Sequence, residues 1–228
     1  MSGWEEELAV FDLETTGVDV ETARIVTAHV GVIDAAGELV SRRDWLVDPG
    51  VEIPAQAQAV HGVSTERARA EGCGAAEAVA EIVGELGGLL ARGVPVTAYN
   101  APYDFTVLDR EARRHGVVPL VAPAPVIDPL VIDRAVDTYR RGKRTLEVTC
   151  AHYGVRLDGA HDAAFDAVAA GRLAQELVRR YPDELGMSIV ELHSAQVRWS
   201  REQNESFQAY MRRVKDPAFT VTIGWPLR

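Results

Sequence analysis

The sequence predicts an α/β fold in which a mixed β-sheet, an antiparallel meander plus parallel strands, is flanked by helices. Three apolar, strand-like segments stand together near the N-terminus, and strand-like and helix-like segments alternate after them. The initial run favours a meander, and the later alternation favours parallel strands joined through helical crossovers. We expect one domain over residues 1–184 and a helical C-terminal extension over residues 185–228 that packs on it.

The meander is expected over three segments. Residues 7–13 (ELAVFDL) form an aliphatic run, and the glycine-containing TTGVDVETA after them is typical of a loop. Residues 25–33 and 38–47 are expected to be two further strands, joined by DAAG as a hairpin turn. We expect the following segment, which contains VDPG and IPAQAQAVHGVS, to be a loop.

The alternating part follows from helical periodicity and from the residues that end helices. Glycine closes the first two helices at Gly93 and Gly116, and Tyr181-Pro182 bounds the last helix of the unit. Strands are expected at 94–99 and 126–128. Helices are expected at 75–92, 102–115, 129–138, 145–153 and 162–180, with a further one at 188–213 and an extended end after it.

Two carboxylates end the first expected strand. Asp12 and Glu14 are two residues apart, so their side chains point to one face, while Leu13 points to the other. Burying two carboxylates at the end of an apolar strand is costly unless a cation compensates them, and metal coordination is the usual reason. The alternative is a strand that runs into solvent, and this pair alone leaves the two interpretations balanced.

Two further acids lie on expected helices. Asp104 occupies the first turn after Pro102, where an acid is often only a favourable partner of the helix dipole. Asp166 follows His161 by five residues, which is about 500° on a helix, so we place His161 on the preceding loop, with Asp162 as the N-cap. A solvent-facing side chain is the alternative for an isolated histidine.

In combination these segments resemble a known family. FDLETTG, YNAPYDF and HDAAFDA occur in this order on an expected strand and two helices. They resemble the three exonuclease motifs of the DEDDh family, a branch of the ribonuclease-H-like superfamily, over about residues 5–182. IPAQAQAVHGVS and GKRTLEVTCAHYGV resemble accessory segments of that family. The overall likeness is to proofreading epsilon-subunit-type domains of bacterial DNA polymerase III.

The resemblance implies a metal-dependent 3′-to-5′ exonuclease. Asp12, Glu14, Asp104 and Asp166 would hold two divalent cations, and His161 would deprotonate the attacking water, with release of nucleoside 5′-monophosphates. Oxygen-only ligands suit Mg²⁺ or Mn²⁺ rather than zinc. A histidine whose ordinary pKa is about 6.5 suits base catalysis at neutral pH.

The resemblance also implies a set of residues that bind the strand end. Thr15 and Thr16 would offer hydroxyls and backbone amides to a terminal 3′-OH or phosphate. Tyr103 would either stack on a base or pack on a neighbouring helix. RRGKR (140–144) is interpreted as a phosphate contact, with a solvated loop as the alternative. The expected substrate-binding residues are Leu13, Thr15, Thr16, Val60, His61, Asn100 and Tyr103.

Composition limits the kind of protein. The 228 residues are 47% hydrophobic, but no apolar run approaches the roughly 20 residues that span a bilayer, and the N-terminus is acidic. We therefore expect a cytoplasmic protein that is not attached to a membrane. A formal charge of −10 argues against coating long nucleic acids, although gripping one chain end needs few phosphate contacts. Cys73, expected in a loop, and Cys150, expected in an apolar helix, are interpreted as structural.

The extension does not resemble a polymerase tether, because little glycine or proline precedes Asp216. Trp199, Phe207, Tyr210 and Met211 instead suggest one apolar side of a helix. We therefore expect a stand-alone enzyme for single-stranded or frayed DNA 3′ ends, with a polymerase or repair protein as a partner still open. RNA ends or short oligoribonucleotides are the alternative substrate, and a non-catalytic nucleic-acid-binding module is the alternative class.

Overall fold

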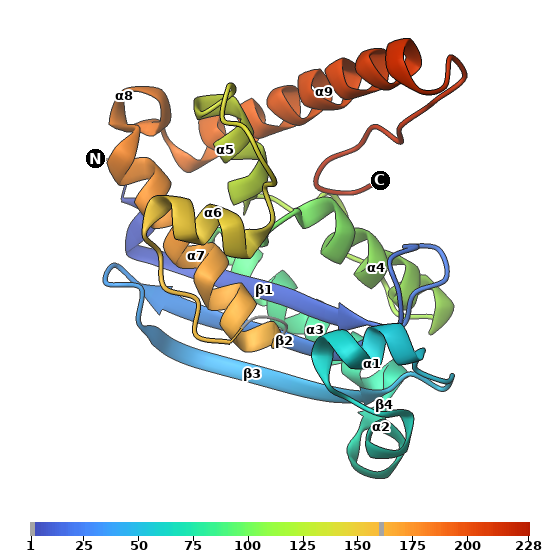
Figure 1. Cartoon of the computed structure of the whole chain (residues 1–228). Coiled ribbons are helices and arrows are strands. Elements are labelled where there is room, and N and C mark those ends of the chain that lie inside the picture. The colour runs from blue at the N-terminus through green and yellow to red at the C-terminus, as the bar shows by residue number, and fades with distance from the viewer. Residues whose placement is uncertain (1–2, 160–161) are drawn as a thin grey trace.

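A mixed sheet forms the centre of the molecule (Figure 1). The computed structural model describes residues 3–159 and 162–228, and within these ranges a sheet of six strands has the order β4-β3-β2-β1-β5-β6. β1, β2 and β3 are antiparallel, while β4, β5 and β6 are added in parallel, so the predicted fold class is confirmed. The strands are β1 (Glu7–Thr15), β2 (Ile25–Asp34), β3 (Leu39–Asp48), β4 (Cys73–Gly74), β5 (Val96–Thr97) and β6 (Val126–Ile127).

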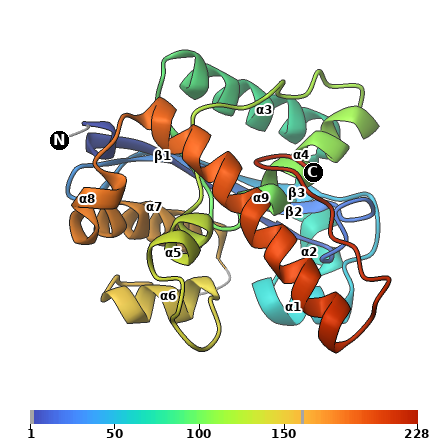
Figure 2. The same ribbon diagram turned by 90° about the horizontal axis from the view of Figure 1, so that it is seen from above.

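Helices cover both faces of this sheet (Figure 2). The helices α3 (Ala75–Ala91) and α4 (Ala101–Arg114) lie on one face, and α7 (Ala163–Arg180) lies on the other with α6 (Leu146–Tyr153) beside it. A Cβ atom on Gly171 of α7 would lie 2.5 Å from Val10 Cγ1, so glycine permits the close approach of α7 to the sheet.

The alternation of β1 decides where its acids point. Ala9, Phe11 and Leu13 belong to the core under α3 and α4, whereas Leu8 and Val10 belong to the core under α7. Because side chains alternate along a strand, Asp12 and Glu14 continue the face that α7 covers. The strand end therefore presents both carboxylates toward the beginning of α7.

The prediction of a loop between β3 and α3 was wrong. That segment contains α1 (Ala55–His61) and α2 (Thr65–Glu71), and Cys73, expected in a loop, pairs with β3 as part of β4. None of the seven residues of α1, all of them described, is buried, so α1 has no apolar stripe that a sequence pattern could reveal. Cys150 is buried in α6, as expected.

The extension consists of α8 (Pro182–Leu185), α9 (Ile189–Val214) and an irregular C-terminal tail. A Ser188–Glu191 capping box starts α9, which packs along α5 (Pro129–Val136) and β6. The tail then turns back toward α4 (Figure 1). There the Trp225 Nε1 donates to Asp128 Oδ2 at 3.3 Å, and the Arg228 backbone N–H donates to Thr106 Oγ1 at 3.1 Å.

Among the residues that the structure describes, no helix combines the length and the apolar character needed to cross a bilayer.

Candidate active site

Three carboxylates meet where β1 ends and α7 begins. Asp12, Glu14 and Asp166 each place an oxygen within 4.8 Å of the others. Asp162 caps α7, its side chain accepting from the backbone N–H of Ala164 at 3.0 Å, so Asp166 falls in the first helical turn. The structure thus brings together three acids that the sequence predicted to act together. We call Asp12, Glu14 and Asp166 the carboxylate cluster.

Asp104 lies beside the carboxylate cluster in the first turn of α4. Its side chain is 3% exposed, and its Oδ1 accepts a hydrogen bond from the Leu13 backbone N–H at 3.2 Å. The charge of Asp104 contributes to raising the pKa of Asp12, so the two carboxyl groups are close enough to interact electrostatically. All four acids predicted from the sequence therefore occupy one region.

The electrostatics of this region favour a bound cation. Burial, followed by the charges of Asp104, Glu14 and Asp166, raises the pKa of Asp12 well above its ordinary value. Burial, followed by the charges of Asp166 and Asp162, raises the pKa of Glu14 to about 7. For both groups every leading cause is burial or another carboxylate. A divalent cation would relieve this repulsion, and oxygen-only ligands suit Mg²⁺ or Mn²⁺.

The loop after β1 is held in place by its own threonines. Thr15 Oγ1 donates to the Gly17 carbonyl oxygen at 2.8 Å, and Tyr103 Oη donates to the same oxygen at 2.6 Å. The Thr16 backbone N–H donates to the Arg24 carbonyl, while Thr16 Oγ1 accepts from the Arg24 N–H. Both hydroxyls predicted to meet substrate are thus engaged within the loop, and Tyr103 ties that loop to α4.

The residues expected to wall the nucleotide pocket differ in exposure. Val60 is 50% exposed and His61 is half-buried, and both belong to α1 rather than to a loop. Burial lowers the pKa of His61, and the nearby Thr15 backbone opposes this shift, so His61 lies beside the end of β1. The Leu13 side chain, 5% exposed, packs in the core, and its backbone N–H is the group that meets Asp104.

Asn100 precedes α4 in the left-handed region, with φ of 63°. Its backbone N–H and that of Ala101 donate to the two carboxylate oxygens of Asp128 at 3.0 and 3.1 Å. Burial raises the pKa of Asp128 to about 6. Sequence reasoning missed this supporting acid. Its position between a short apolar strand and Pro129, where it caps α5, is the signal that could have found it.

His161 lies outside the described residues, and its role as general base stays a prediction.

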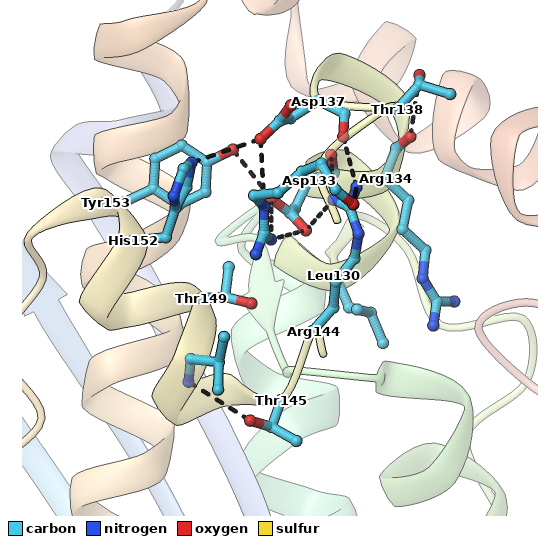
Figure 3. A network of polar contacts seen from close by, with 12 residues as sticks. Leu130, Asp133, Arg134, Asp137, Thr138, Arg144, Thr145, Thr149, His152 and Tyr153 are labelled. Carbon is cyan, nitrogen blue, oxygen red and sulfur yellow. Dashed lines mark hydrogen bonds and ion pairs between the residues drawn. The ribbon is translucent and has the colours of Figure 1, made fainter. Parts of the chain in front are cut away.

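Two of the four cations in RRGKR, Arg140 and Arg144, pair with one buried acid, and Figure 3 shows Arg144 beside that acid, Asp133. Asp133 is fully buried and accepts from Arg140 Nη2 at 2.6 Å, from Arg144 Nη1 at 2.5 Å and from Tyr153 Oη at 2.9 Å. We call these four residues the Asp133 cluster. The interpretation of RRGKR as a phosphate contact was wrong for Arg140 and Arg144, because both pair with Asp133 instead. Leaving this buried carboxylate without partners would cost far more free energy than withdrawing the two guanidinium groups from solvent.

Comparisons with known proteins point in one direction. A family model described as Exonuclease matches residues 9–174. The DNA polymerase III subunit epsilon-like protein of Rhodobacter capsulatus is 32% identical over 184 residues, which are 76% of this chain and 23% of that protein. A PolC-type DNA polymerase III of Streptococcus thermophilus is 27% identical over 188 residues, 82% of this chain and 12% of that protein. The chain thus spans less than a quarter of either relative.

Solved structures share the fold. Exonuclease X in complex with 5′ overhanging duplex DNA superposes with a TM-score of 0.61 at 18% identity, covering 83% of this chain and 99% of that one. Exonuclease I of E. coli in complex with a dT13 oligonucleotide superposes with a TM-score of 0.66 at 20% identity, covering 79% of this chain and 43% of that one. At these identities the likeness shows the fold alone.

Proposed function

The chain belongs to the exonuclease family, and from that premise we propose a metal-dependent 3′-to-5′ exonuclease of the DEDDh type. The observation that carries the proposal is the carboxylate cluster, whose oxygens lie within 4.8 Å of one another, with Asp104 buried beside it. Four acids are expensive to gather without a catalytic or metal-binding purpose. A binding module that had lost catalysis would have no need of all four.

The acids fit a pair of divalent cations, Mg²⁺ or Mn²⁺. Two observations support this fit: the three side chains offer only oxygen ligands within 4.8 Å of one another, and burial together with neighbouring carboxylates raises the pKa of Asp12 and of Glu14. When bound, such ions supply Lewis acidity toward water and charge neutralisation at a phosphodiester. Asp12, Glu14 and Asp166 would hold the ions, and Asp104 would complete the set from α4.

The chain itself would position the strand end and move the proton. The loop that Tyr103 and Thr15 fix beside β1 would form one wall for the terminal nucleotide, and His61 would form another. The imidazole of His161 would accept a proton from the attacking water. Release of nucleoside 5′-monophosphates would follow.

Single-stranded or frayed DNA 3′ ends are the substrate we propose. The two structural neighbours were solved with DNA, and the two relatives carry the names of DNA polymerase III components. A polymerase that presents the 3′ end is the partner class that the relatives' names favour, and a repair protein is the alternative. The sequence also allowed RNA ends, so the test must compare the two sugars.

The test uses 3′-labelled and 5′-labelled DNA and RNA oligonucleotides with Mg²⁺, with Mn²⁺ and with chelator. We expect mononucleotide release from the 3′ label and progressive shortening of 5′-labelled DNA, only when metal is present. Release from RNA alone would replace DNA as the substrate, and absence of release with either metal would favour the binding module. Shortening from the 5′ end would refute the direction.

Substitutions connect the activity to the carboxylate cluster. Asp12→Ala and Asp166→Ala should each abolish turnover while circular dichroism shows an intact fold. Asp183→Ala, at an exposed position in α8, is the matched control and should keep wild-type turnover. Full activity in either cluster variant would rule out the proposed site.

A further inference from the structure

An open groove lies between the distal half of α9, the C-terminal tail and the neighbouring part of the domain. It has a volume of about 1230 Å³ and is lined by the loop after β1, by Asn100, by α5, by the distal half of α9 and by the tail. Figure 1 shows α9 running above α4 and α5, and Figure 2 shows it crossing the molecule. A pocket for a small molecule is typically about 300–1,000 Å³, so this groove suits an extended ligand.

The groove is lined in part by residues that adjoin the candidate active site along the chain. Asn100 lines it and directly precedes α4, whose first turn carries Asp104. Asp19, Val20 and Glu21 also line it, and they follow the Gly17 carbonyl that Tyr103 holds. A strand whose 3′ end reached the carboxylate cluster would therefore have the groove next to it.

One wall of the groove is aromatic. Trp199, Phe207 and Tyr210 of α9 line it, at spacings of eight and three residues that keep them near one helical face. Phe207 remains 49% exposed although its ring meets that of Phe219 edge-on in the tail, and Tyr210 remains 51% exposed. Exposed aromatic rings that line one wall of a groove provide faces on which nucleobases stack.

Two of the four arginines that line the groove are paired with acids. Arg110 pairs with Glu21 and Arg144 pairs with Asp133. Arg134, in contrast, is exposed, and its guanidinium makes no hydrogen bond or ion pair within the part of the chain that is described. Figure 3 shows it directed away from the Asp133 cluster. Arg228 also lines the groove, and within the described residues its guanidinium makes no hydrogen bond or ion pair either, so the groove offers two unpaired guanidinium groups together with aromatic rings.

We propose that this groove binds the single-stranded segment behind the 3′-terminal nucleotides, chiefly by stacking bases on Phe207 and Tyr210. The proposal rests on the proposed function, because it assigns the groove to the same substrate. A duplex would stack its bases on each other and withhold their faces, so the groove selects single strands. The family match ends at residue 174, so α9 and this wall lie outside the matched segment.

The test compares a dinucleotide with a longer strand. The full chain is assayed with dT2 and dT12 in the metal that supports hydrolysis. For the wild type, kcat/KM should be higher for dT12, because only the longer strand reaches the groove. Combined Phe207→Ala and Tyr210→Ala substitution should lower kcat/KM for dT12 about 5- to 100-fold, mainly through KM, and leave dT2 unchanged.

Matched variants separate stacking from folding. Tyr210→Ala alone keeps the Phe207–Phe219 contact and should lose part of the advantage of dT12, while Tyr210→Phe should retain it. Val214→Ala removes an exposed apolar side chain of the same helix that does not line the groove, and it should behave as wild type. The advantage should also persist at higher salt, since few phosphate contacts support it.

Separate outcomes refute the groove and the proposed function. If the wild type hydrolyses both substrates but the aromatic variants keep the full advantage of dT12, the groove does not bind the strand and the proposal is overturned. If no substrate is hydrolysed, the proposed function fails. In that case anisotropy titration of labelled dT12 in chelator still tests the groove, because the double variant must then bind more weakly than the wild type, and equal affinity would overturn the proposal.

Discussion

Replacing Glu14 by glutamine should stabilise the metal-free protein at high pH. The pKa of Glu14 is raised from 4.5 to about 7 in the folded chain, chiefly by burial and then by the charges of Asp166 and Asp162. Between these values the folded state holds a proton that the unfolded state has released. The free energy of unfolding therefore falls as pH rises through this window, and the loss is complete above pH 7.

The magnitude follows from that window. At 1.36 kcal/mol per pKa unit, a rise from 4.5 to about 7 corresponds to about 3 kcal/mol. Glu14 is only half-buried, so screening by water reduces the stabilisation expected for Glu14→Gln to roughly 1–2 kcal/mol at pH 8. For a chain of this length the melting temperature should rise by roughly 2–8 °C. At pH 4 both states of the wild type are mostly protonated at Glu14, so the difference should nearly vanish.

The assay is thermal unfolding by circular dichroism in chelator at the two pH values. Glu205→Gln, at an exposed position of α9, is the control and should change stability by less than about 0.5 kcal/mol. Addition of Mg²⁺ or Mn²⁺ at pH 8 should stabilise the wild type more than Glu14→Gln, because the variant has less repulsion to relieve. A lower melting temperature for Glu14→Gln at pH 8, or an equal shift at both pH values, would refute the reasoning.

Three further substitutions test other parts of the molecule. His161→Ala should lower the rate of hydrolysis by about 10²–10⁴ while stabilisation by metal persists, and near-normal activity would remove it as the base. Asp133→Ala leaves two buried guanidinium groups without their partner and should cost about 3–5 kcal/mol in urea unfolding, whereas Asp137→Ala, at a partly exposed acid, should cost much less. Gly171→Ala forces a methyl group against Val10 and should destabilise by about 1–3 kcal/mol. Gly84→Ala in α3 meets open space and should be neutral or stabilising, so equal stability of the two glycine variants would contradict the close approach.

Local patterns were sufficient to predict most of the fold. The strands of the meander and the helices of the alternating part carry apolar periodicity and end at glycine or proline, which single-sequence reasoning can use. α1 was missed because its seven residues, AQAQAVH, include no buried side chain and so form no buried apolar stripe. Ser64 is the N-cap of α2, and its side chain accepts a hydrogen bond from the Arg67 N–H. This residue could have predicted the start of α2, but the composition of the surrounding segment obscured the signal.

The candidate site likewise has residues whose placement the sequence predicts and contacts that it does not predict. The face shared by Asp12 and Glu14 follows from strand alternation, and the placement of Asp166 follows from the cap at Asp162. The partners of the cationic run could not be read from the sequence, because Asp133 lies seven and eleven residues before Arg140 and Arg144 across an irregular loop. Only the folded chain shows which cations a buried carboxylate occupies.

The side chains of α9 have a consequence for the edge of the sheet. β6 is an outermost strand, and its Val126 accepts from Gln196 Nε2 and donates to His193 Nδ1, while Gln196 Oε1 accepts from the Asp128 N–H. Backbone groups at an exposed edge are a template for pairing with another chain. A chain ended at residue 184 would bare this edge, and we expect it to self-associate by strand addition, seen as concentration-dependent oligomers in size-exclusion chromatography. The extension would thus act as a guard against aggregation.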